Sequence, residues 1–152
     1  MALEPGSITR ISPLDLNESL AIGITFPLLN DGRFEQSFTV KEQVKSNILN
    51  VLLTERGERL NLPNFGVGLK SLLFENNVNT DELTQRISEQ LDEHVPDIEI
   101  TNVISDFLED QHILKITLEY VVIYSNEKDA IKINIGGNSD SNTTLNSSEG
   151  GF

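Results

Sequence analysis

Three glutamates, Glu55, Glu58 and Glu75, are the residues of this chain whose type and spacing could do chemistry. Paired carboxylates hydrolyse glycosidic bonds when they lie about 5 to 10 Å apart across a sugar-binding cleft and one of them stays protonated. However, the chain has no Trp and only two Tyr, so platforms for sugar rings are scarce. Arg56 and Arg59 also favour the charged form of the neighbouring carboxylates. A cell-wall glycosidase is therefore an alternative and not the first interpretation.

Metal, nucleotide and thiol chemistry are not indicated by the other residues. The chain has no cysteine, and its two histidines, His94 and His112, stand on segments without the spacing of metal ligands. The sequence Gly66-Val67-Gly68 lacks the third glycine and the preceding strand of a dinucleotide site, and no Gly-Lys-Ser or Gly-Lys-Thr phosphate loop is present. We expect no catalytic residue, no metal and no cofactor.

The charge of the chain is strongly negative and unevenly distributed. The formal net charge of −13 repels phosphate backbones and anionic lipids, so neither nucleic acid nor a membrane is an expected partner. Residues 75–110 hold eleven acidic residues and one basic residue, whereas residues 41–70 hold five basic and three acidic residues. This pattern is typical of a solvated acidic face; the alternative is a sign-patterned surface that orients partners in an assembly.

The length of 152 residues predicts one domain with one hydrophobic core. No apolar run approaches the roughly 20 residues of a membrane span, and the first six residues have neither a basic nor an apolar signal region. We expect a protein that is made and kept in a cytoplasm.

A first helix is predicted from Val40 to about Leu53. Thr39 and Glu42 form the Thr-x-x-Glu capping box at its start. One apolar stripe faces the core, made by Val44, Ile48, Val51 and Leu52. Gly57 can adopt the left-handed conformation beyond the helix end, and Pro63 prevents the helix from resuming. A compact loop must follow.

A second helix is predicted from about Asp81 to Val95, with Asn79 as its N-cap and Pro96 as its end. Its apolar residues recur at spacings of four: Leu83, Ile87, Leu91 and Val95.

After the second helix the apolar period changes to two, which predicts an antiparallel meander of three strands. The alternating residues are Ile98, Ile100 and Ile104, then Leu114, Ile116, Leu118, Tyr120, Val122 and Tyr124, and finally Ile131, Ile133 and Ile135. The runs 21–26 and 33–38 favour a loose hairpin. Together these elements predict an α+β fold, with two main helices on one face of a mostly antiparallel sheet of three to five strands.

The two ends of the chain differ from its middle. Residues 1–20 carry Pro, Gly and scattered leucines without periodicity, which predicts an extended arm that only a neighbour orders. Residues 21–135 form the predicted domain. Residues 136–152 are rich in Gly, Ser and Asn and predict a disordered tail.

A sequence signature follows the first helix, over residues 54–75. It reads TERGERLNLPNFGVGLKSLLFE. It resembles the signature of the small baseplate wedge family of contractile phage tails, which is found also in type VI secretion and related injection systems. The matching positions are Thr54, Gly57, Arg59, Pro63, Phe65, Gly66, Leu69, Leu73, Phe74 and Glu75. The resemblance extends over residues 21–135.

The resemblance implies a structural protein on which tail-sheath polymerisation starts. It implies β-augmentation, in which sheath subunits lend strands to an unpaired sheet edge. The implied partners are the tail-sheath protein, other baseplate wedge proteins and, more remotely, tube or hub proteins. The implied location is the tail baseplate of a virion assembled in the host cytoplasm. The alternatives are the glycosidase, since some members of the resembling family are labelled lysozyme-like, and a generic assembly adaptor.

The sequence departs from the family pattern after the second helix. Where the family often has Glu-Pro-Arg, this chain has Val95-Pro96-Asp97. The resemblance associates that tripeptide with docking to sheath strands or wedge neighbours. A charge-assisted contact at this point therefore cannot be carried over.

Two groups of residues are predicted to carry function. The loop is predicted to be organised by Thr54, Gly57, Arg59, Pro63, Phe65 and Gly66. The Arg59 guanidinium has five donors for the free carbonyls at the helix end, and direct contact with a partner is the alternative. The predicted partner-binding residues are Ala130, Lys132, Asn134, Ile135, Val121 and Ile123. In the short strand 130–135, Lys132 is the one charged residue that would hinder pairing with another chain. Val121 and Ile123 form an apolar patch.

Overall fold

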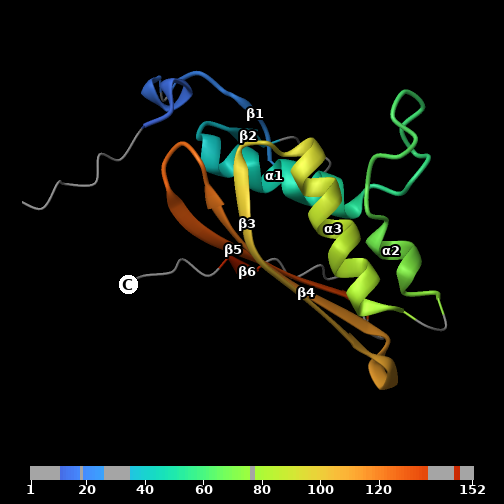
Figure 1. Cartoon of the computed structure of the whole chain (residues 1–152). Helices are drawn as coiled ribbons and strands as arrows, with labels where there is room; N and C mark the ends of the chain where they lie inside the picture. The colour runs from blue at the N-terminus through green and yellow to red at the C-terminus, as the bar shows by residue number, and fades with distance from the viewer. Residues whose placement is uncertain (1–10, 18, 26–34, 76–77, 137–145, 148–152) are drawn as a thin grey trace, which may run out of the picture.

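The computed structural model describes residues 11–17, 19–25, 35–75, 78–136 and 146–147 (Figure 1). In chain order the elements are η1 (Pro13–Leu16), β1 (Gly23–Ile24), β2 (Gln36–Ser37), α1 (Val40–Leu53), α2 (Leu69–Leu72), α3 (Thr80–His94), β3 (Ile98–Leu108), η2 (Glu109–Gln111), β4 (Ile113–Val122), β5 (Glu127–Gly136) and β6 (Asn146–Ser147). The predicted α+β fold is confirmed.

Both predicted helices form, and their caps are the predicted ones. The Thr39 side chain accepts a hydrogen bond from the Glu42 amide, and the Glu42 carboxylate accepts one from the Thr39 amide, which completes the capping box of α1. The Asn79 side chain accepts from the first amides of α3. The short helix α2 lies in the second half of the signature.

The main sheet has four antiparallel strands in the order β3-β4-β5-β6, while β1 and β2 pair in a separate small sheet. The helices lie on one side of the main sheet (Figure 1). Its inner face and the helices form one core, with side chains from α1, α3, β4 and β5. The large, fully buried residues include Ile48, Leu52, Ile87, Leu91, Leu118, Tyr120, Ile131 and Ile133.

Strand β3 changes face halfway along because of a β-bulge. Its register with β4 shifts between Ile100 and Asn102, which leaves Thr101 without a partner on β4. One extra residue moves the side chains that follow to the other face. Ile104 is therefore 45% exposed, and Val103 packs against the core. The expectation that Ile104 shares the inner face with Ile100 was wrong.

Strand β5 is longer than the sequence predicted. It begins at Glu127 and not at residue 130, because the turn from β4 is tight and Asn126 takes a positive φ of 55° there. Its end also differs, since Gly136, expected in the tail, is the last residue of β5. Farther along the tail, Asn146 and Ser147 form β6 against β5, which the composition did not predict. Residues 137–145 and 148–152 lie outside the described residues.

The described part of the N-terminal segment, residues 11–17, contacts the rest of the chain. An Asp15 carboxylate oxygen accepts a 2.7 Å hydrogen bond from the Val40 amide, and Ser12 is buried. The first amides of a helix lack intrahelical partners, so a carboxylate there stabilises α1. The predicted hairpin is confirmed in β1 and β2; residues 1–10, 18 and 26–34 lie outside the described residues. None of the described helices is long and apolar enough to cross a membrane.

Candidate functional site

Two regions are candidates for function: the signature loop between α1 and α2, residues 54–68, and the outer edge of β5. The residues predicted to organise the loop lie in the first region, and those predicted to bind partners lie in or near the second.

Backbone hydrogen bonds close the signature loop upon itself. The Gly57 amide donates to the Pro63 carbonyl at 2.9 Å, and the Leu62 amide donates to the Arg59 carbonyl at 3.1 Å. The end of the loop returns to the helix, since the Gly68 amide donates to the Thr54 carbonyl at 3.0 Å. Several of the carbonyls therefore accept from backbone amides. They are those of Asn50, Val51 and Thr54 at the helix end and those of Glu55, Arg59, Leu62 and Pro63 in the loop.

Gly66 is required where the loop passes back over the end of α1. Its φ is +101°, which side chains rarely adopt, and a Cβ atom at this position would lie 2.3 Å from the Thr54 carbonyl oxygen. Gly57 also has a positive φ of 84°, as predicted, but no atom lies within 4 Å of its missing Cβ. The two glycines are therefore needed for different reasons. Gly66 lets the loop backbone approach the Thr54 carbonyl closely, whereas Gly57 only provides a backbone conformation with positive φ.

The Arg59 side chain is exposed and stacks on Phe65. Its guanidinium carbon lies 3.9 Å from the centre of the Phe65 ring, which is buried and in turn lies 4.7 Å from the His94 ring. This contact is a cation–π interaction. Among the described residues the Arg59 guanidinium contacts the Phe65 ring, and its role as a hydrogen-bond donor to the loop carbonyls stays a prediction.

Gln90 holds the loop to α3, and sequence analysis missed it. The Gly66 amide donates to the Gln90 side-chain oxygen at 2.8 Å in a buried setting. Gln90 is itself 7% exposed although it is polar, and it lies beside Leu91 on the inner side of α3. A buried polar group must find a partner. The signal in the sequence is a glutamine on the apolar stripe of an amphipathic helix, but nothing there identifies the partner.

The three candidate catalytic carboxylates do not gather in one cleft. Glu58 accepts from the Glu55 amide at 3.0 Å, and Glu55 accepts from the Ser71 amide at 3.2 Å, so both support the loop backbone. Glu75 instead lines a groove of about 960 Å³ with Glu109 and Asp110. The groove is also lined by Leu73, Phe74, Phe107 and Ile113. Among the described residues, no group of three or more His, Asp or Glu is placed to hold a metal ion.

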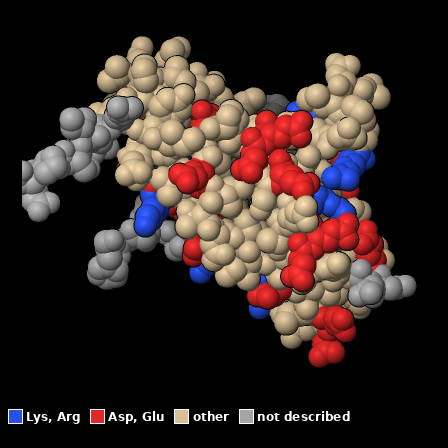
Figure 2. All heavy atoms as spheres, viewed as in Figure 1, with Lys and Arg blue, Asp and Glu red and all other residues tan. Residues whose placement is uncertain are grey.

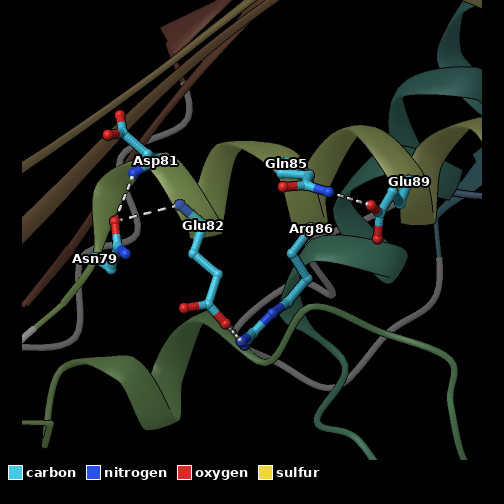
Figure 3. A network of polar contacts seen from close by, with 6 residues as sticks. All are labelled: Asn79, Asp81, Glu82, Gln85, Arg86 and Glu89. Carbon is cyan, nitrogen blue, oxygen red and sulfur yellow. Dashed lines mark hydrogen bonds and ion pairs between the residues drawn. The ribbon is translucent and has the colours of Figure 1, made fainter.

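The acidic residues of the segment 75–110 lie mainly on α3, on β3 and in the turn after β3. On the face shown in Figure 2, acidic side chains cover more of the surface than basic ones. Arg86, the one basic residue of that segment, lies 3.2 Å from Glu82, and Gln85 donates to Glu89 on the next turn (Figure 3). These i, i+4 pairs lie on the exposed side of the helix. The arrangement is that of a solvated acidic face.

The direction of the backbone groups along β4 follows from two hydrogen bonds at its end. The Ile123 amide donates to the Asp97 carbonyl at 3.0 Å, so the backbone groups of Ile123 point toward β3. The Val122 carbonyl accepts from the Asn126 amide at 2.8 Å, so the backbone groups of Val122 point toward β5. Backbone groups alternate in direction along a strand, so the even-numbered residues of β4 bond to β5.

The same alternation shows which groups of β5 point outward. The register pairs Val122 with Glu127 and continues without a bulge to Leu114 with Ile135. The odd-numbered residues of β5 therefore bond to β4. The even-numbered residues direct their amides and carbonyls away from it: Lys128, Ala130, Lys132, Asn134 and Gly136. Lys132 accordingly stands opposite Asn146 of β6.

The side chains of β5 alternate as predicted. Ile131, Ile133 and Ile135 are buried, and Lys132 is exposed, with Ala130 and Asn134 half-buried. Ile135, predicted among the partner-binding residues, therefore belongs to the core. The Tyr120 hydroxyl donates to Asp129 at 3.2 Å and ties β4 to β5; burial, and then the Asp129 charge, raise the pKa of Tyr120 above its usual range.

The remaining predicted partner-binding residues lie on β4 and just after it. Val121 is half-buried and Ile123 is 55% exposed, so the expected apolar patch is present at this end of the sheet. Val95, which stands in place of the family glutamate, is buried and contributes to the core. The structure thus brings Ala130, Lys132 and Asn134 together on one edge and leaves Ile123 apart from them.

The opposite edge, on β3, is protected. It carries the bulge at Thr101, and Glu99 and Asp106 are exposed along it. Ser105 contacts Thr84 at 2.8 Å and donates to the Thr80 carbonyl at 2.9 Å, which joins the strand to α3. Bulges, charges and a covering helix are the devices that prevent strand addition. Of the two long outer strands, β5 is the more open to another chain.

Comparison with known proteins gives one family and two similar structures. The family model described as baseplate wedge protein gp25 matches residues 39–127. The structure of a protein described as a candidate tail lysozyme of Geobacter sulfurreducens is 24% identical over 68% of this chain and 96% of that one, with a TM-score of 0.56. A chain of the baseplate complex from the type VI secretion system is 16% identical over 66% of this chain and 95% of that one, also with a TM-score of 0.56. These two likenesses concern the fold. No curated protein matches.

Proposed function

The chain belongs to the family of the baseplate wedge protein gp25, whose model matches more than half of it, and on this premise we propose that it nucleates tail-sheath assembly. Its role in the baseplate is structural. In the proposed step, the first ring of sheath subunits adds strands to the β5 edge, and strand exchange at that edge joins the sheath to the baseplate.

The observation that carries this proposal is the direction of the β5 backbone. Five residues, from Lys128 to Gly136 in steps of two, turn their amides and carbonyls away from β4. Within the described part of the chain, β6 pairs with only Ile131 and Lys132 of this strand. Unpaired edge groups supply affinity for an added strand, and alternate side chains supply its register.

The charges of the two edges support the choice of β5. The exposed side chains of Lys128 and Lys132 lie at the outward-facing positions of β5, and the acidic residues of this strand, Glu127 and Asp129, lie at the alternate positions. The β3 edge instead carries the exposed acidic side chains of Glu99 and Asp106. Opposite charges across paired strands stabilise the pairing and like charges disfavour it. The edge therefore suits a sheath strand that carries acidic or uncharged side chains opposite the two lysines.

The location and the other partners follow from the same premise. We place the chain in the tail baseplate of a particle assembled in a host cytoplasm. The fold is shared with a chain of the type VI secretion baseplate complex, which supports assembly with other baseplate proteins. Tube or hub proteins are more distant candidates. The exposed apolar patch at Val121 and Ile123 is a further surface for one of these neighbours.

The test is sheath growth on baseplates that carry Lys132→Pro. Proline removes the outward amide at the centre of the edge and leaves the bonds of β5 to β4 in place, so sheath growth should be lost while the isolated variant keeps its circular dichroism spectrum.

Two control variants define the result. Lys132→Ala removes the charge but keeps the amide and should support sheath growth. Thr101→Pro places the same residue on the β3 edge, at the unpaired position of the bulge, and should also support growth. Normal sheaths on folded Lys132→Pro baseplates would contradict the proposal.

A further inference from the structure

Strand β6 occupies the part of the β5 edge at which the proposed function places the sheath strand. Asn146 pairs with Lys132 and Ser147 pairs with Ile131, in antiparallel register. In Figure 1 β6 lies beside β5, next to which it stands in the strand order of the sheet. We propose that the chain's own residues 146–147 are the resting occupant of the acceptor edge, and that a sheath strand binds by displacing them. This inference rests on the proposed function of β5.

The pairing lies at the centre of the acceptor edge and not at its end. Lys132 is the middle one of the five residues whose backbone groups face outward, with Lys128 and Ala130 before it and Asn134 and Gly136 after it. A strand that pairs along the whole edge must use the Lys132 amide and carbonyl. Since Asn146 stands opposite these same groups, β6 and a full-length incoming strand exclude each other.

The resting occupant is short, which makes it replaceable. In the described part of the chain β6 pairs with two residues of β5, whereas β5 has ten. A longer strand forms more ladder hydrogen bonds and more cross-strand side-chain contacts than β6 does. The exchange therefore runs toward the longer strand once that strand reaches the edge.

The covalent tether makes the short occupant effective against dilute competitors. A segment joined to its site by a flexible linker competes with an effective concentration on the order of millimolar. In this chain residues 137–145, which include Gly, Ser and Asn, join β5 to β6. The strand of a single sheath subunit in solution must compete with the tethered β6 without help from any other contact. A subunit held by other contacts in a forming ring presents its strand at a high local concentration as well.

The consequence is control over where a sheath begins. An open strand edge is a template for unwanted pairing, and proteins cover such edges to avoid it. Here β6, a segment of the same chain, covers the edge. A sheath strand displaces it when other contacts of the sheath subunit hold that strand near β5. Sheath strands are thereby admitted on the assembled baseplate and refused by the free subunit.

Hydrogen exchange of the purified chain tests the occupancy itself. Asn146→Pro removes the amide that faces Lys132, so deuterium uptake of the peptide covering β5 should rise, and removal of residues 137–152 should raise it equally. Ser147→Pro is the matched control, because the alternation directs the Ser147 amide away from β5 and its loss should leave uptake unchanged. Uptake that is the same in all four proteins would overturn the proposal.

Binding of purified sheath protein to the isolated chain tests the competition. We expect at least fivefold tighter binding to Asn146→Pro and to the chain without residues 137–152 than to the wild type, and no change for Ser147→Pro. Equal binding to all of them would overturn the inference, and the proposed function would still stand if Lys132→Pro baseplates grew no sheath. Normal sheath growth on Lys132→Pro baseplates would instead refute the proposed function, whatever the exchange data showed.

Discussion

The signature loop and the β5 edge use their backbone groups in opposite ways. In the loop, the amides of Gly57, Leu62, Gly66 and Gly68 all find acceptors within the chain, and Phe65 is buried beneath Arg59. On β5, every second residue directs its amide and carbonyl outward, and in the described part of the chain β6 pairs with only two residues of this strand. The first region is satisfied internally and the second is left open.

This difference separates the residues that identify the family from those that we propose to act. Within the signature of residues 54–75, close backbone approach and a buried amide both restrict what position 66 can hold. The β5 edge has no signature, since strand addition uses main-chain groups that every residue other than proline possesses. We therefore propose a structural role for the most recognisable segment of this chain. Substitutions should accordingly affect stability in the loop and assembly at the edge.

The largest loss of stability is expected for Gly66→Ala. The new Cβ would lie 2.3 Å from the Thr54 carbonyl oxygen, and φ of +101° is strained for alanine. Strain and overpacking together should lower the free energy of unfolding by about 3 kcal/mol. Gly57→Ala shares the positive φ without the contact and should cost about 1 kcal/mol. Equal midpoints for the two variants in urea unfolding would show that the close approach is not needed.

The second largest loss is expected for Gln90→Leu. The substitution keeps the size of the side chain but leaves the buried Gly66 amide without its acceptor, which should cost about 1 to 3 kcal/mol. Gln85→Leu, on the exposed side of the same helix, should change stability by no more than about 0.5 kcal/mol. Urea unfolding of both variants measures the difference. If they were equally stable, the Gln90 contact would not hold the loop.

Arg59→Ala should have a smaller effect than the sequence suggested. A guanidinium that satisfied buried carbonyls would contribute about 1 to 3 kcal/mol. An exposed cation stacked on an aromatic ring contributes about 0.5 to 1 kcal/mol. The melting temperature should fall slightly, and Arg59→Lys should recover part of the loss. A loss of baseplate incorporation at unchanged melting temperature would instead identify Arg59 as a partner contact.

The smallest effect is expected for Glu58→Gln. Its side-chain oxygen can still accept from the Glu55 amide, so the stability should stay within about 0.5 kcal/mol of the wild type. Purified wild-type protein and the variant should both release no sugar from peptidoglycan in a reducing-end assay. Sustained turnover that Glu58→Gln abolished would refute the structural role and restore the glycosidase alternative.

Local patterns in the sequence determined most of the elements of this fold. The capping box of Thr39 and Glu42, the Asn79 cap and the apolar stripes located α1 and α3, because caps and helical periodicity are properties of neighbouring residues. Alternation located β4 and β5 for the same reason. The order of residues 54–75 pointed to the family that the comparison then showed.

Only the tertiary structure decided which groups meet across the chain. The bulge at Thr101 reversed the face of Ile104, because the register with β4 depends on how the sheet packs and not on the alternation alone. Gln90 reaches the Gly66 amide, 24 residues away along the chain, and Asn146 stands opposite Lys132. These pairs depend on hydrogen bonds between segments distant in sequence, and no local pattern specifies which donor will meet which acceptor.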